Sequence, residues 1–183
     1  MADSELVVRA RTGDVAAYEM LMAPRVDQMY RIAQLVLRDF DTAEDAVQEA
    51  LVRCWRDLRR LRDPDRFEAW LHRLLLNAMT DEARRRRRHA GSVALLRTEP
   101  MQLDATRAVA DHDEIARVFD RLSVEHRTIV VLHHYVGLSI PEAAAATGVP
   151  IGTAKSRLHY AAMALRAALE ADARASEARS AFA

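Results

Sequence analysis

Apolar residues recur every three or four positions through the first half of the chain, which is the spacing of one helix face. Two short amphipathic stretches flank a turn at 12–14, and a third stretch ends near Leu37. The clearest helical period follows between Asp41 and Leu61, with an apolar face made of Val47, Leu51, Cys54, Trp55, Leu58 and Leu61. Asp41 and Glu44 have the spacing of a capping box, so this helix is predicted to begin at Asp41.

The next predicted helix begins with the same kind of signal. Asp65 and Glu68 again have capping-box spacing. The inner face that follows holds Phe67, Trp70, Leu71, Leu74 and Ala78, and the helix runs into the arginine run 84–88. From His89 to about Ala110 the period fails among glycine, proline and small polar residues, which predicts a linker.

The C-terminal part has the pattern of a helix-turn-helix between Ser139 and Leu169. A helix carrying Ile129 to Tyr135 ends at a glycine suited to a helix C-cap, Gly137. Ser139 and Glu142 then form a capping box that opens a short helix, which Gly148 ends, and another helix opens at 152–153. A short helix, a tight glycine turn and a second helix are typical of this motif.

Polar side chains gather in the first turns of that second helix, the part that enters the major groove in helix-turn-helix proteins. They are Thr153, Lys155, Ser156, Arg157 and His159, with a packing stripe of Ala154, Leu158, Ala161 and Leu165. Arg157 suits a guanine edge, and Lys155 and Ser156 suit phosphates or bases. The same spacing also fits an ordinary helical hairpin with a solvated polar face, so the local pattern favours the helix-turn-helix but leaves this second interpretation open.

Length allows one medium domain or two small helical domains, and composition supports a folded, all-α protein. The chain has 183 residues, of which 50% are hydrophobic and 30% charged. With five Gly and five Pro, strand-and-turn architectures are not favoured. The formal net charge is +0, so a nucleic-acid partner has to be inferred from where the charges lie and not from their sum.

Several classes of protein are disfavoured by what the sequence lacks. A single cysteine, Cys54, excludes an intramolecular disulfide and a cysteine zinc site, and its place on the apolar stripe suits a small core residue. The histidines have no partner carboxylates or cysteines at metal-ligand spacing, so we expect no metal, no cofactor, no catalytic site and no enzyme activity. Neither a signal peptide nor an uncharged run of about 18 residues occurs, so we expect a cytoplasmic protein without membrane insertion.

Several motifs occur in the same order as in a known family. They are Asp45-Ala-Val-Gln48-Glu49, Arg66-Phe67-Glu-Ala-Trp70-Leu71 with Asn77, Leu122 to Arg127, and Gly152-Thr153-Ala-Lys155-Ser156-Arg157-Leu158. Together they closely resemble the sigma-70 family, in its compact extracytoplasmic-function branch. The resemblance covers Leu6 to about Leu169, and collinear motifs across two modules are more specific than one helix-turn-helix.

The resemblance implies a non-catalytic protein that carries core RNA polymerase to promoters and helps to open the duplex. The expected domains are a sigma region 2 helical bundle at 1–89, a flexible linker at 90–110, a sigma region 4 helix-turn-helix at 111–170 and a tail at 171–183. The implied partners are the clamp helices of the polymerase's largest subunit, the flap of the second largest, and promoter DNA. We also expect an anti-sigma factor, because the chain carries no sensory module.

The resemblance also implies three sets of site residues. Core polymerase binding falls to Asp45, Gln48 and Glu49, with Arg53 and Arg56 as lesser candidates. Minus-10 DNA binding falls to Arg62, Arg66, Asn77, Arg84, Arg85 and Arg88. Minus-35 DNA binding falls to Thr153, Lys155, Ser156, Arg157 and His159. Spacing alone fits solvated surface residues in each set, and it favours Phe67 and Trp70 as core residues before base-stacking platforms.

The chain departs from the family pattern at two places in the second module. Ala143 and Thr147 stand where larger aliphatic residues are usual, so we expect looser packing of the first reader helix. Tyr160 and Ala162 replace arginines, which predicts modest affinity for the upstream element. Two other hypotheses stay open: a one-component helix-turn-helix regulator, which would need a sensor domain or a dimer seam, and a sigma-like decoy held by another protein.

Overall fold

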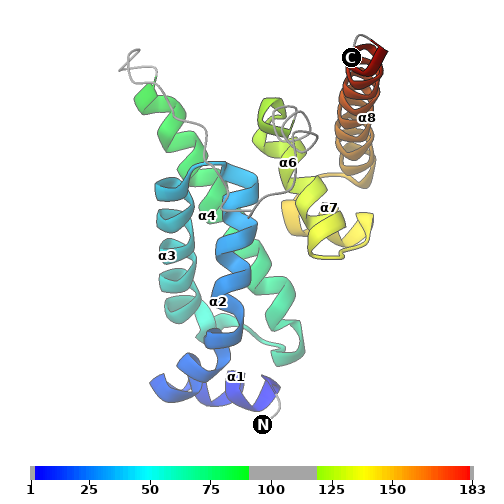
Figure 1. Ribbon diagram of the computed structural model, residues 1–183. Coiled ribbons are helices and arrows are strands. Elements are labelled where there is room, and N and C mark those ends of the chain that lie inside the picture. Colours follow the sequence, from blue (N-terminus) through cyan, green and yellow to red (C-terminus); the bar gives the residue numbers. More distant parts are fainter. Residues whose placement is uncertain (1–2, 91–118, 182–183) are drawn as a thin grey trace. The chain divides into compact units, whose positions relative to one another are not determined.

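The computed structural model describes residues 3–90 and 119–181, which fall into two compact units on either side of the intervening segment (Figure 1). Throughout the described ranges the regular structure is helical, and no strand is present there. This agrees with the predicted all-α class. No helix in those ranges is long and apolar enough to cross a membrane.

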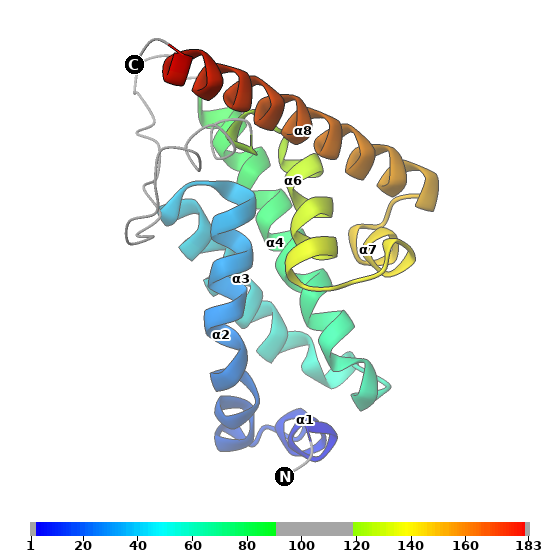
Figure 2. The same ribbon diagram turned by 45° about the vertical axis from the view of Figure 1, so that its right-hand side comes forward.

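The first unit is a bundle of three long helices with a shorter helix at one end (Figures 1 and 2). Its elements are α1 (Asp3–Arg11), α2 (Val15–Leu37), α3 (Phe40–Asp57), the 3-10 turns η1 (Leu58–Arg60) and η2 (Pro64–Arg66), and α4 (Phe67–Ala90). Helix α3 packs against both α2 and α4. The chain therefore places the predicted protein-binding helix directly beside the predicted DNA-reading helix.

The core of this unit is built from apolar residues of α1, α2, α3, α4 and the turn η1. Its largest fully buried side chains are Val7, Leu21, Ile32, Val36, Val47, Cys54, Leu58, Leu75 and Met79. Burial raises the pKa of the Cys54 thiol to about 12, which agrees with the prediction of an inert core residue. Trp55 departs from the predicted stripe, because 39% of it is exposed.

Two helix starts differ from the prediction. Helix α3 is capped by Asp39, whose side chain accepts a hydrogen bond from the Thr42 N–H at 2.9 Å, and not by Asp41. The backbone is left-handed at Arg38, where α2 ends, and extended at Asp39. The Asp39 side chain therefore lies at the N-cap position, where it accepts from the free backbone N–H groups in the first turn of α3. Likewise Asp63 caps η2 ahead of α4, which displaces Asp65 from the predicted role.

Helix α2 unites two stretches that the sequence pattern separates. Pro24 lies inside it, exposed, and deprives the helix of one backbone hydrogen bond. Burial of Leu21, Met22, Met29 and Ile32 on either side of the proline outweighs that loss. Tertiary packing thus carries the helix through a residue that locally favours a break.

The second unit contains the predicted helix-turn-helix. Helix α6 (Val124–Val130) passes into a π-helical turn, η3 (Val131–Tyr135), and is followed by α7 (Ile140–Thr147) and α8 (Ile151–Ala181). The predicted Ser139–Glu142 capping box is present, and Gly137 and Gly148 have positive φ angles of 84° and 68°. Both glycines therefore turn the chain as predicted, and α8 continues past Leu169 to Ala181.

The predicted linker is only partly covered by the described residues. Helix α4 continues through His89 to Ala90, so the helix ends later than the loss of apolar period indicates. The remaining linker residues, 91–110, lie outside the described ranges, as do the apolar residues Ile115 and Val118.

Candidate nucleic-acid and protein interfaces

The outer face of α3 carries the residues predicted to bind polymerase. Asp45, Gln48 and Glu49 are exposed, and their spacing puts them on one side of the helix. Gln48 donates a 3.3 Å hydrogen bond to Glu44. Asp45 forms no ion pair or side-chain hydrogen bond with the described residues. This acidic and amide face is available to a basic partner.

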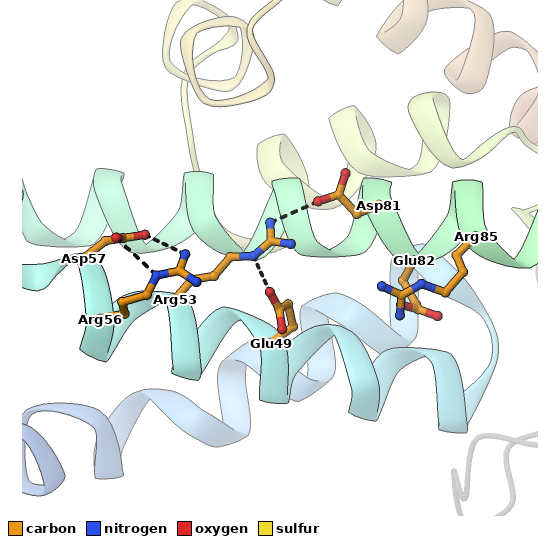
Figure 3. Close-up of polar contacts among 7 residues, drawn as sticks. All are labelled: Glu49, Arg53, Arg56, Asp57, Asp81, Glu82 and Arg85. Carbon is orange, nitrogen blue, oxygen red and sulfur yellow. Dashed lines mark hydrogen bonds and ion pairs between the residues drawn. The ribbon is translucent and has the colours of Figure 1, made fainter.

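The two arginines predicted as lesser polymerase contacts both form ion pairs within the first unit (Figure 3). The side chain of Arg53 is 23% exposed and turns toward α4, pairing with Glu49 at 2.6 Å and Asp81 at 3.0 Å. Arg56 is 63% exposed and pairs with Asp57 at 3.0 Å. Arg53 therefore bridges Glu49 on the outer face of α3 and Asp81 on α4, while Arg56 stays exposed.

The exposed face of α4 carries Asn77 and most of the arginine run. Asn77, Arg84, Arg85 and Arg88 are exposed, and Arg85 pairs with Glu82 at 2.7 Å. Arg86 instead pairs with Asp39 at 3.0 Å. The run is thus divided between a cationic surface and one arginine that ties the end of α4 to the start of α3.

The predicted minus-10 residues do not form a single patch. Arg62 and Arg66 are exposed near the start of α4, and Arg66 pairs with Asp63 at 3.3 Å. Arg84 to Arg88 lie at the other end of α4, about 30 Å away at ~1.5 Å per helical residue. A nucleic-acid strand that contacts both groups has to follow the length of the helix.

The Arg86–Asp39 pair makes the stability of the first unit depend on pH. Burial acts to raise the pKa of Asp39, but hydrogen bonds from Thr42 and the positive charge of Arg86 outweigh it and hold this pKa below 3.8. A carboxylate with a depressed pKa stabilises the fold above its unfolded pKa, and the contribution disappears as pH falls through the folded pKa.

Asp39→Asn is therefore expected to be less stable than wild type at neutral pH, by about 0.5 to 1 kcal/mol, because Asn keeps the cap but loses the ion pair. This difference in the free energy of unfolding should shrink as the pH falls below about 4 and disappear below the folded-state pKa of Asp39. Both tryptophans, Trp55 and Trp70, lie in the first unit, so their fluorescence in denaturant measures its unfolding. A difference that persists unchanged at pH 3 contradicts the pairing.

A cluster of contacts around Arg25, which we name the Arg25 clasp, escapes detection from sequence. Phe67 is buried, as the core interpretation expects, and the Arg25 guanidinium lies 5.4 Å from its ring centre. Arg25 also pairs with Glu68 and Asp3, and it donates to the Leu21 carbonyl. Helical spacing does not reveal this clasp, because its members come from three helices.

The first turns of α8 present the predicted minus-35 residues on one helix end. Lys155, Ser156 and His159 are exposed, and Thr153 and Arg157 are partly exposed. Ala154 and Ala161 are fully buried beneath them, as the packing stripe predicts. Tyr160, which replaces a basic residue of the family pattern, is 60% exposed and lies against the His126 ring at 4.7 Å between ring centres.

Comparison with known proteins gives the same two regions in the same order. Sigma-70 region 2 matches residues 21–89, and Sigma-70 region 4 matches residues 112–165. The RNA polymerase sigma-E factor of Streptomyces coelicolor is 35% identical over 168 residues, covering 90% of this chain and 94% of that protein. The ECF RNA polymerase sigma factor SigL of Mycobacterium tuberculosis is 36% identical over 167 residues, covering 87% and 94%.

Solved structures share the fold. CnrH, in complex with the cytosolic domain of CnrY, is 31% identical with a TM-score of 0.67, covering 94% of this chain and 99% of that chain. The sigma factor RpoE from Bartonella quintana, in complex with the anti-sigma factor NepR, is 25% identical with a TM-score of 0.72, covering 85% and 98%. With both sigma regions present on the expected helices, the chain belongs to the sigma-70 family as an extracytoplasmic-function sigma factor.

Proposed function

We propose that this protein binds core RNA polymerase through the outer face of α3 and directs it to promoters in the cytoplasm, without catalysis of its own. The observation that carries the proposal is the exposed acidic and amide set Asp45, Gln48 and Glu49, presented beside a cationic DNA-reading helix. Carboxylates and an amide on one face suit a basic partner helix, such as the clamp helices of the largest polymerase subunit.

Helix α4 is proposed to follow the minus-10 element. Opening DNA costs ~1.4 kcal/mol of stacking for each base step, which a protein offsets by holding flipped bases and the single-stranded backbone. The exposed Asn77 amide suits a base edge, and Arg84, Arg85 and Arg88 suit successive phosphates. Arg62 and Arg66 extend the contact toward the start of the helix, and binding should fall steeply with salt.

The first turns of α8 are proposed to read the minus-35 element in the major groove. Thr153, Lys155, Ser156, Arg157 and His159 support this by their place on the second helix of the motif. The second unit is thereby the duplex reader, joined to the first by the proposed linker at 90–110, and its contact with the polymerase flap follows from the same family pattern.

Arg157→Ala is expected to weaken use of the cognate upstream element by ~1 to 3 kcal/mol, because a two-pronged guanine contact is lost. The measurement compares transcription by holoenzyme from the cognate promoter and from promoters with altered minus-35 bases. Arg166→Ala, an exposed arginine farther along α8, is the matched control and should act as wild type. Equal losses on every promoter would make Arg157 a phosphate contact that reads no sequence.

Run-off transcription with purified core polymerase and a set of candidate promoters tests the main proposal. Specific transcripts that depend on this protein support a sigma factor. DNA binding without polymerase, and without initiation, supports the one-component regulator instead. Failure both to bind core polymerase and to direct initiation refutes the proposed function.

An anti-sigma partner is the remaining part of the proposal. CnrH and RpoE are described in complexes with CnrY and the anti-sigma factor NepR, respectively. We infer similar control for this chain, because it shares the fold of both proteins over most of its length. Full activity of the protein in unstressed cells would contradict this inference.

A further inference from the structure

One arginine links the outer face of α3 to α4. Arg53 donates from Nε to Oε1 of Glu49 at 2.6 Å and from Nη1 to Oδ2 of Asp81 at 3.0 Å (Figure 3). Glu49 is on the same helix, one turn earlier, whereas Asp81 belongs to α4. The guanidinium thus joins a predicted polymerase contact to a residue of the neighbouring helix.

The geometry makes the two contacts depend on each other. A guanidinium is planar and rigid, so the bond to Asp81 restricts the direction in which Nε points toward Glu49. Arg53 is 23% exposed, while Glu49 and Asp81 are 47% and 49% exposed. Arg53 is therefore the enclosed member, and Glu49 remains open to an incoming partner.

We propose that Arg53 and Asp81 are positioning residues of the polymerase interface: Asp81 holds Arg53, and Arg53 holds Glu49 in the orientation in which polymerase meets it. This inference rests on the proposed function of the α3 face. A side chain that is already held loses less conformational freedom on binding, which strengthens binding.

The positive charge of Arg53 does not abolish the attraction between this group and a basic partner. One guanidinium is shared between two carboxylates, so the group keeps a net negative charge. The described contacts of Glu49 use Oε1, which leaves Oε2 for a basic side chain of the partner. Attraction to a cationic helix therefore persists while the orientation of Glu49 is restricted.

The test measures the Kd of the full-length protein for core polymerase. Asp81→Ala is expected to weaken binding about 3- to 10-fold, because Arg53 is released and Glu49 is then no longer held in place before binding. Glu82→Ala is the matched control: it removes the neighbouring carboxylate, which pairs with Arg85 on the same helix, and should leave the Kd unchanged. Wild-type affinity of Asp81→Ala would overturn the inference.

A double-mutant cycle separates positioning from general destabilisation. In a Glu49→Ala background, Asp81→Ala should have no further effect, because its influence passes through Glu49. An equal loss in both backgrounds would assign Asp81 a structural or direct role and overturn the proposal. If wild type itself does not bind core polymerase, the proposed function fails, whereas a normal wild type with an unaffected Asp81→Ala refutes the positioning role alone.

Discussion

Asp45→Lys is expected to weaken binding to core RNA polymerase by at least about 30-fold, because a cation replaces a carboxylate that faces a basic partner. The fold should be unaffected. Asp45 is exposed and lies four residues from both Asp41 and Glu49. A lysine at position 45 therefore turns two repulsive charge pairs on the helix surface into two attractive ones. Titration of labelled protein with core polymerase measures the affinity, and thermal unfolding measures the fold.

The structure makes Asp45 a better target for this test than Glu49. A lysine at 49 would face Arg53 and disturb the link to α4, so its effect would mix binding with local structure. Asp27→Lys, a charge reversal at an exposed position of α2, is the matched control and should retain affinity. Equal affinities of Asp45→Lys and Asp27→Lys would exclude the outer face of α3 as the polymerase interface.

Arg25→Met is expected to lower the free energy of unfolding of the first unit by about 2 to 3 kcal/mol. The substitution keeps a long apolar side chain but removes the pairs with Glu68 and Asp3, the bond to the Leu21 carbonyl and the contact with the Phe67 ring. The Arg25 side chain is 11% exposed, so the lost partners are not fully replaced by water. Tryptophan fluorescence in urea reports the unfolding of this unit.

Arg31→Met provides the comparison for the clasp. It changes an exposed arginine of the same helix, for which a shift within ~0.5 kcal/mol is expected. Arg25→Lys should lie between wild type and Arg25→Met, because an ammonium keeps the charge but lacks the planar fork. Matching midpoints for Arg25→Met and Arg31→Met would show that the clasp contributes nothing measurable.

The helix starts show how local signals fail by a few residues. Asp39 and Asp41 are both acceptable N-caps, and so are Asp63 and Asp65. The choice depends on where the chain leaves its previous element, as the left-handed Arg38 illustrates. In contrast, Ser139 and Gly148 were predictable, since each has a distinct chemical role in capping and no close competitor.

The sequence by itself determined the order of the helices and their buried faces, and it identified the helix-turn-helix and the family. It could do so because apolar period, capping residues and collinear motifs are local properties of the chain. The partners of the arginines were decided by the tertiary structure. Arg25, Arg53 and Arg86 meet Glu68, Asp81 and Asp39, respectively, across helix boundaries. Such ion pairs depend on which helix faces come together, so an arginine assigned to a partner by its motif can instead be an internal link.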